Sequence, residues 1–264
     1  MALPEWRHIM RYLALIALMA MLVVFPSGSA AEEAQKPAVR TDNMTLAELE
    51  KAGDSARVAK DFDSAIVYFE AAVRKDKKNA KLFNKLGLSY LKANRLSDAR
   101  FSFEKAVKNN SKYADALNNL GAVYFVQRNL NGATKYFKKA VAMDETRPVF
   151  HVNLGAAWFG QKKVERAIVE YGRALQLDPT VLSRTNNGGV TAQVTTAEER
   201  ARYDYMLAKI YAKLGNPEQC LRCLRKAKEE GYRNIGNVYK DEEFSQLWQD
   251  ARLAEIAPPP PPKQ

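Results

Sequence analysis

The chain is poor in the residues that most often carry chemistry. Its 264 residues include two cysteines and two histidines. Two cysteines are too few for a disulfide-built scaffold. His8 lies in a segment that we expect to be removed, which leaves His151 as the one histidine of the folded part. A zinc site with several histidines is therefore excluded, and we interpret His151 as a packed side chain. We predict no metal site and no cofactor.

The short motifs of common enzymes are absent as well. The sequence holds no phosphate-binding GxxxxGK loop, no GxSxG nucleophile turn and no HExxH zinc helix. Nucleophilic catalysis of the Ser-His or Cys-His type would depend on a single histidine. We therefore predict that the protein is not an enzyme and that it has no catalytic residue.

The sequence contains one extended apolar run, but this run has fewer residues than a helix needs to span a membrane. It covers residues 12–25, after the basic residues Arg7 and Arg11 and before the small residues that end at Ala30. A helix of 14 residues is about 21 Å long, less than the roughly 30 Å of a bilayer core. A basic start, a short apolar run and small residues are typical of a secretory signal peptide. We predict a signal peptide over residues 1–30, with an uncleaved anchor as the alternative.

Export and the scarcity of cysteine favour a bacterial periplasm or cell envelope as the location. Nucleic acid is not expected as a partner of an exported chain. Residues 31–44 lack periodicity and are predicted to be a linker. Thr45, three residues before Glu48, is typical of a capping box that begins a helix, and so is Thr196, three residues before Glu199.

The rest of the chain repeats with a period of 34 residues. Four sets of residues keep this spacing through four units: Gly53, Gly87, Gly121 and Gly155; Ala65, Ala99, Ala133 and Ala167; Phe69, Phe103, Phe137 and Tyr171; Ala72, Ala106, Ala140 and Ala174. Apolar residues within a unit recur at spacings of three and four, so each unit should form two helices. Small residues let the helices approach closely, and large ones fill the space between units. Because glycine inside a helix costs about 0.5–1 kcal/mol relative to alanine, its recurrence implies a packing reason.

These residues resemble the tetratricopeptide repeat family. The strings FNKLGLSY, LNNLGAVY and HVNLGAAW follow the family pattern, whereas LEKAGDSA in the first unit departs from it, as suits an end unit. A fifth unit contains DYMLAKIY, with Ala208 at the glycine position. The resemblance implies an all-α fold, a right-handed superhelix (α-solenoid) of about five helix-turn-helix repeats with a C-terminal capping helix.

We place repeats one to four in residues 46–179 and the fifth in residues 196–231. The segment 180–195 between them is rich in Asn and Gly and is predicted to be an inserted loop. Residues 232–256 should form a capping segment, with a short amphipathic helix around Phe244, Leu247 and Trp248. Residues 257–264 are predicted to be an extended polyproline tail.

The family implies a function in holding other proteins or peptides, in a groove lined by the first helix of each unit. Carried onto this sequence, its positions give the predicted groove residues: Asn84, Leu88, Leu91, Lys92, Asn118, Asn119, Ala122, Phe125, Val126, Val152, Asn153, Ala156 and Phe159. Asn119 and Asn153 correspond to asparagines with which some relatives grip a peptide backbone. Glu50 and Asp54 are expected at one end of the groove, and Arg202 and Lys209 at the other. The partner is expected to be a peptide or a protein segment in envelope assembly.

Two alternatives stay open. Cys220 and Cys223 form a CxxC pair, which would suit a thiol-redox or disulfide-dependent accessory protein. In the alternative interpretation Cys220 stands where other units have a packed alanine, and Cys223 is its neighbour at the surface. The formal net charge of +11 includes a basic run on the second helices of units two and three: Arg100, Lys105, Lys108, Lys112, Lys135, Lys138 and Lys139. This face could contact an anionic membrane surface or envelope polymer. The oligomeric state is not indicated by the sequence.

Overall fold

The computed structural model describes residues 40–183 and 196–261. Contacts divide the chain after Arg40, and the elements described here lie within the unit Thr41–Gln264. The predicted signal peptide, the linker up to residue 39 and most of the inserted loop lie outside the described residues. Within the described part, no helix combines the length and the apolar character that a membrane crossing would need.

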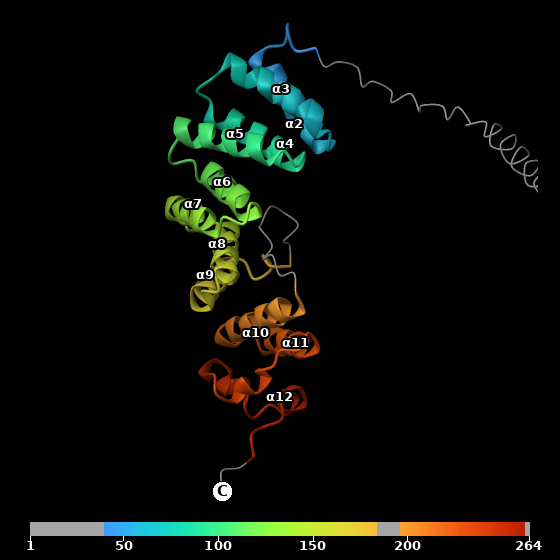
Figure 1. Cartoon of the computed structure of the whole chain (residues 1–264), viewed down its shortest axis with the longest axis vertical. Coiled ribbons are helices and arrows are strands. Elements are labelled where there is room, and N and C mark those ends of the chain that lie inside the picture. The colour runs from blue at the N-terminus through green and yellow to red at the C-terminus, as the bar shows by residue number, and fades with distance from the viewer. Residues whose placement is uncertain (1–39, 184–195, 262–264) are drawn as a thin grey trace, which may run out of the picture. The chain divides into compact units, whose positions relative to one another are not determined.

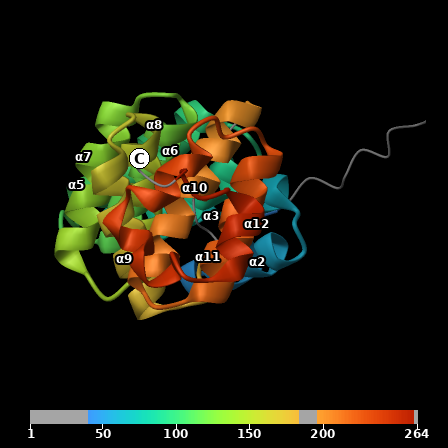
Figure 2. The same cartoon turned by 90° about the horizontal axis from the view of Figure 1, so that it is seen from below.

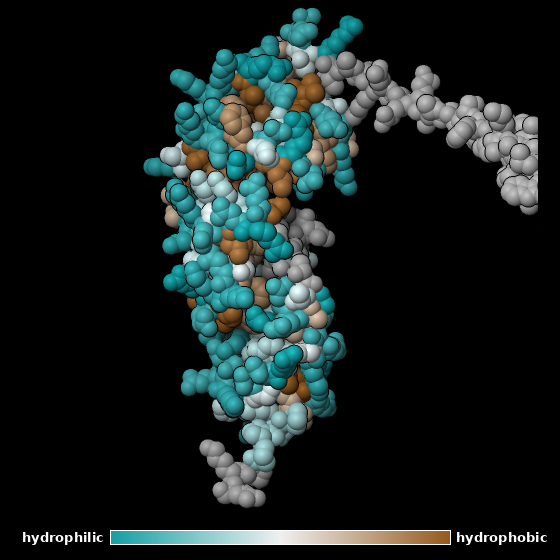
Figure 3. Space-filling model, viewed as in Figure 1, coloured by the Kyte–Doolittle hydropathy of each residue, from teal (hydrophilic) through white to brown (hydrophobic). Residues whose placement is uncertain are grey.

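The described part is built from α-helices that follow one another as antiparallel pairs (Figure 1). The pairs are α2 (Leu46–Val58) with α3 (Phe62–Lys75), α4 (Ala80–Lys92) with α5 (Leu96–Asn109), α6 (Ala114–Val126) with α7 (Leu130–Met143), α8 (Pro148–Gly160) with α9 (Val164–Leu177), and α10 (Ala197–Lys213) with α11 (Pro217–Glu229). The described residues contain no strand. This confirms the all-α class and the repeated helical hairpin. The face in Figure 3 is mostly hydrophilic, with hydrophobic residues gathered in a few places, as expected for a core between helices.

Local sequence signals account for where these helices begin. Both predicted capping boxes form: Thr45 accepts from the Glu48 amide and Thr196 from the Glu199 amide, and each glutamate carboxylate accepts from the backbone amide of its threonine. Asparagine caps other helices, such as Asn79 before α4. Each cap satisfies amides that the first turn of a helix leaves without a partner.

The recurring glycines have the packing role that their spacing predicted. A Cβ built on Gly87 would lie 2.6 Å from the ring of Phe103, and one on Gly121 would lie 2.6 Å from the ring of Phe137. Both rings are fully buried. Gly53 and Gly155 face Phe69 and Tyr171 in the same way. The first helix of each hairpin therefore lies against an aromatic ring of the second, at a distance that a side chain would prevent.

The turn inside each hairpin keeps the same register. Lys60, Asn94, Arg128 and Lys162 have φ between 59° and 61°, and they follow one another at intervals of 34 residues. In the fifth hairpin the corresponding residue is Gly215, with φ 67°. In the first four hairpins, a residue other than glycine therefore adopts the left-handed backbone conformation, which glycine adopts more easily.

The C-terminal segment differs in part from the prediction. Residues around Phe244 and Leu247 form the 3₁₀ helix η2 (Glu242–Leu247), after η1 (Ile235–Tyr239), and the α-helix comes later as α12 (Ala251–Ile256). Phe244 and Leu247 are buried as expected, whereas Trp248 is 40 % exposed. The short helix predicted here is therefore a 3₁₀ helix, and it contacts α10. Figure 2 shows this end of the chain, where α12 contacts α11.

The predicted tail begins one residue later than expected. Ala257 is fully buried, and its carbonyl accepts a hydrogen bond from the Tyr239 hydroxyl at 2.9 Å. Ala257 therefore belongs to the cap. Residues 258–261 are exposed, and residues 262–264 lie outside the described part.

Candidate binding surface

Three of the four predicted groove residues of α4 lie near the surface. Leu88 and Leu91 are half-buried and Lys92 is exposed. Asn84 is 5 % exposed, so its amide points among neighbouring helices. Together these side chains offer a mostly apolar strip with one cation at its end.

The predicted groove residues of α6 and α8 are placed differently from the prediction. Phe125, Val152, Asn153 and Ala156 are all buried, with exposures between 0 % and 3 %. Asn118 is buried as well, Asn119 and Ala122 are half-buried, and Val126 is 43 % exposed. The buried residues among them therefore do not line an open apolar groove along the middle repeats.

The reason is that these apolar residues belong to the protein's own core. Phe125, Val152 and Ala156 share one hydrophobic cluster with residues of α10, including Tyr205 and Met206. Phe159 is half-buried, and its ring meets the ring of Tyr203 edge-on with centroids 5.3 Å apart. Residues that face outward in an isolated hairpin are thus used for packing within this chain.

The asparagines of α4, α6 and α8 form a ladder between successive repeats. Asn119 donates to Oδ1 of Asn84 at 2.9 Å, and Asn153 donates to Oδ1 of Asn118 at 2.7 Å. Asn84 in turn donates to the Tyr113 hydroxyl at 3.4 Å. Each rung joins residues 35 positions apart. The amides expected to grip a peptide backbone are therefore used, at least in part, to fasten one repeat to the next.

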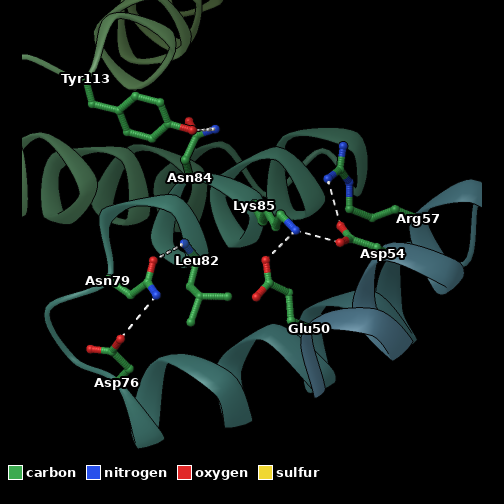
Figure 4. A network of polar contacts seen from close by, with 9 residues as sticks. All are labelled: Glu50, Asp54, Arg57, Asp76, Asn79, Leu82, Asn84, Lys85 and Tyr113. Atoms are coloured by element: carbon green, nitrogen blue, oxygen red, sulfur yellow. Dashed lines mark hydrogen bonds and ion pairs between the residues drawn. The ribbon is translucent and has the colours of Figure 1, made fainter. Parts of the chain in front are cut away.

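The first rung of this ladder is ionic (Figure 4). Lys85 occupies the position of Asn119 one repeat earlier, and its Nζ lies 2.7 Å from Oε1 of Glu50 and 2.5 Å from Oδ2 of Asp54. Burial acts to lower the pKa of Lys85, but the hydrogen bonds and charges of Asp54 and Glu50 outweigh it, and the pKa is raised. Lys85 therefore stays charged, and the acidic end that the sequence predicted is partly neutralised.

The last position of the ladder is apolar. Val152 occupies the position of Asn118 one repeat later, and Met206 corresponds to Asn153 once the insertion is allowed for. Both side chains are buried in the same hydrophobic cluster. The ladder thus ends where the inserted segment begins, and the fifth repeat is held by apolar packing.

A cavity of about 570 Å³ lies beside the fifth repeat. Its apolar wall comes from α9 and the start of α10 and consists of Val164, Ile168, Val169 and Ala201, with Glu165 and Glu198 of the same helices also lining the cavity. The other wall is polar and is lined by Arg202, Tyr205, Lys209, Lys213, Arg233, Asp241 and Glu243. The two basic residues predicted for this end, Arg202 and Lys209, both line the cavity beside apolar residues.

Ion pairs order the polar wall. Lys209 lies 3.2 Å from Asp241 and 3.3 Å from Glu243, and Lys213 lies 3.3 Å from Glu243. The Tyr205 hydroxyl donates to Asp241 at 2.8 Å. Burial raises the pKa of Tyr205, and the hydrogen bond to Asp241 raises it further, so the phenol stays protonated and keeps this bond.

Sequence reasoning missed Asp241, Glu243 and Val169. The two acids lie in a segment without helical periodicity, so no spacing placed them beside Lys209. Val169 carried a signal that was available: it is an apolar residue on the charged face of α9, and it is 68 % exposed.

The two cysteines are both buried in α11. Cys220 is fully buried and Cys223 is 7 % exposed, so the expectation that Cys223 lies at the surface is wrong. Burial raises the pKa of each thiol to about 12. Because the thiolate is the reactive form, this environment favours packing over thiol exchange.

His151 is a buried packing residue with two hydrogen-bond partners. Its Nδ1 lies 2.8 Å from the Glu170 carboxylate, and its Nε2 lies 3.0 Å from the Glu145 carbonyl. The described residues contain no group of His, Cys, Asp and Glu that could hold a metal ion.

Comparisons with known proteins agree with the repeat. A tetratricopeptide repeat model matches residues 50–100 and 84–148, and a second tetratricopeptide repeat model matches residues 201–230. No curated protein matches the sequence.

Solved structures with a similar fold include MamA proteins and YrrB. A MamA protein is 21 % identical, with a TM-score of 0.52 over 75 % of this chain and 95 % of that one. MamA from Desulfovibrio magneticus RS-1 is 16 % identical, with a TM-score of 0.51 over 71 % and 95 %. YrrB, described as a TPR protein with an unusual peptide-binding site, is 17 % identical, with a TM-score of 0.50 over 75 % and 92 %. At these identities the likeness concerns the fold.

Proposed function

The chain belongs to the tetratricopeptide repeat family, and on this premise we propose that it is an exported scaffold that binds a peptide or protein segment in the cavity beside its fifth repeat. Proteins with this fold generally serve as interaction scaffolds. The solved structure of YrrB carries a peptide-binding site by its own description. The location we propose is a bacterial periplasm or cell envelope, on the strength of the apolar run in residues 12–25.

The cavity carries this proposal. Its volume of about 570 Å³ is in the range of a ligand pocket. The apolar residues that were predicted to line a groove in the neighbouring repeats are largely buried, which favours the cavity as the binding site. The apolar wall suits one aliphatic or aromatic side chain of a bound segment. The ordered ion pairs of Lys209 and Lys213 give the other wall fixed charges, which can orient polar groups on either side of that anchor.

The test uses an exposed residue, so that binding and folding can be separated. Val169 lines the cavity and is 68 % exposed, so Val169→Asp should leave the unfolding temperature unchanged. A charge on the apolar wall should weaken binding by about 10- to 100-fold. The matched control is Val67→Asp, because Val67 occupies the same register position in the first repeat and is outside the cavity.

The probe is a peptide selected from a displayed library on the full chain, with its affinity measured by fluorescence polarisation. We expect the affinity to fall for Val169→Asp and to stay constant for Val67→Asp. Equal affinities for both variants would remove the cavity as the binding site. The mass of the protein recovered from the envelope fraction tests export, since removal of residues 1–30 gives a defined shorter chain.

A further inference from the structure

The outward faces of α5 and α7 carry a concentration of positive charge. Their cations are Arg100, Lys105 and Lys108 on α5 and Lys135, Lys138 and Lys139 on α7; we call these six residues, together with Phe101, the basic face. The α7 sequence contains no carboxylate. The two in α5 are paired locally, Asp98 with Arg95 at 2.8 Å and Glu104 with Arg100 at 3.8 Å. The face thus has a large excess of cations.

An exposed aromatic ring lies among these cations. Phe101 is 58 % exposed, and Nζ of Lys105 lies 5.1 Å from the centre of its ring. On α7, Nζ of Lys135 and Nζ of Lys139 lie 5.7 Å and 5.6 Å from the centre of the Tyr136 ring. Lysine and aromatic side chains are therefore interleaved on both helices.

The two helices contribute to one continuous surface. Tyr136 of α7 stacks on Tyr124 of α6, with centroids 5.4 Å apart. Burial raises the pKa of the Tyr124 phenol. Both rings pack against a hydrophobic cluster that includes Ala99 and Phe103 of α5. The stacked pair therefore joins the surface of α7 to that of α5.

The second helices of the flanking hairpins lack this character. On α3, Asp63 and Glu70 accompany Arg74 and Lys75, and on α9, Glu165 and Glu170 accompany Arg166 and Arg173. Mixed charge of this kind is usual for a solvated helix. Among the second helices of the described hairpins, α7 alone carries cations and no carboxylate. The second helix of the fifth repeat, α11, also has an excess of cations, with four against two carboxylates, and it therefore serves as the comparison for the basic face.

We propose that the basic face is a docking site for an anionic lipid bilayer, with its lysines at the headgroups and Phe101 inserted between them. Clustered lysines are attracted to anionic headgroups. Burying the exposed Phe101 ring is favourable where the partner offers an apolar layer, which a bilayer has and a soluble polyanion lacks. This surface is separate from the cavity beside the fifth repeat, so the chain could hold a partner while attached to a membrane.

The experiment measures co-flotation of the full chain with vesicles. One set is phosphatidylcholine alone, and in the other about a third of the lipid is phosphatidylglycerol. The charge variant is Lys105→Glu with Lys135→Glu and Lys139→Glu. Its matched control is Arg222→Glu with Arg225→Glu and Lys226→Glu on the exposed side of α11, which changes the net charge equally. The insertion variant is Phe101→Ser.

We expect binding to the anionic vesicles only, and a steep loss of binding as salt rises. The charge variant should bind about a hundredfold more weakly, and the α11 control should stay within about threefold of the unmodified chain. Phe101→Ser should weaken binding severalfold while the dependence on salt remains. Val169→Asp should bind vesicles normally, which separates this proposal from the proposed function.

Three results would overturn the proposal. Equal binding to both vesicle types would remove the role of anionic lipid. Equal losses for the charge variant and the α11 control would show that net charge, and not the basic face, attracts the vesicles. Normal vesicle binding by Phe101→Ser, with tight binding of the chain to soluble polyphosphate, would indicate a polyanion in place of a bilayer.

Discussion

Replacing Gly121 with alanine should destabilise the protein although alanine is the better helix former. The new Cβ would lie 2.6 Å and 2.7 Å from two ring atoms of Phe137, which is fully buried. Carbon atoms in ordinary contact are about 3.5–4.0 Å apart, so the ring would have to move by roughly 1 Å. Such overpacking costs about 1–3 kcal/mol, against a gain of about 1 kcal/mol in helix propensity. We expect a net loss of up to about 2 kcal/mol.

The fifth repeat suggests how to relieve this clash. There Ala208 stands at the glycine position and Leu224 at the aromatic position, and both are fully buried. In a Phe137→Leu background, Gly121→Ala should therefore become stabilising, because the ring that it meets is gone. The control is Gly172→Ala in α9, whose Cβ would find its nearest neighbour at 3.8 Å. It should stabilise the chain by about 1 kcal/mol.

Urea unfolding is monitored by far-ultraviolet circular dichroism for the unmodified chain, Gly121→Ala, Phe137→Leu and the double variant. The Gly172→Ala control is measured in the same way. The coupling between positions 121 and 137 should be about 2 kcal/mol. If Gly121→Ala raised the unfolding midpoint as Gly172→Ala does, the close approach of the two helices would not be the reason for the glycine.

Two further predictions concern the polar contacts between helices. The hydrogen bond that His151 donates to the Glu170 carboxylate, against the opposing effect of burial, raises the pKa of His151. The contribution of this bond to stability should therefore be complete below about pH 6.5 and lost as pH rises through the raised value. Urea midpoints across this range should show the loss, and Glu170→Gln should flatten the profile; a midpoint independent of pH in the unmodified chain would contradict the reasoning. Asn153→Ala should cost about 1–3 kcal/mol, because it leaves Oδ1 of the buried Asn118 without its donor. Asn118→Val with Asn153→Met, copying Val152 and Met206, should recover most of that loss, and an equal loss in the single and double variants would refute the ladder.

Much of the fold could be predicted because it repeats. A spacing of 34 residues in glycine, alanine and aromatic positions fixes which helix faces which, and both capping boxes fix where helices begin. The structure confirms the close approach of Gly121 to Phe137 on these grounds. Packing of this kind is local, between neighbours in the sequence, so a pattern within one chain is enough to reveal it.

The candidate site was harder, because it depends on what packs against a helix from outside its own hairpin. Family positions placed Val152 and Ala156 in an open groove, yet both are buried. A signal was present in α8: its sequence PVFHVNLGAAWFG carries no Asp, Glu, Lys or Arg on any side, and a helix that is apolar all round is usually buried. The cavity was beyond prediction, since Asp241 and Glu243 come from a segment without periodicity.

The ladder also has a consequence for how an array of this kind can grow. A rung needs an asparagine at the fifth position of one unit and another at the sixth position of the next, and residues 114–147 supply both, as Asn118 and Asn119. A tandem copy of those 34 residues would therefore form an asparagine pair with the original unit. The pairs with both flanking units would also be kept. A tandem copy of the fourth unit would instead set Asn153 of the copy against Val152 of the original. Lengthening by gene duplication is thus open in the centre of the array and closed at its C-terminal end.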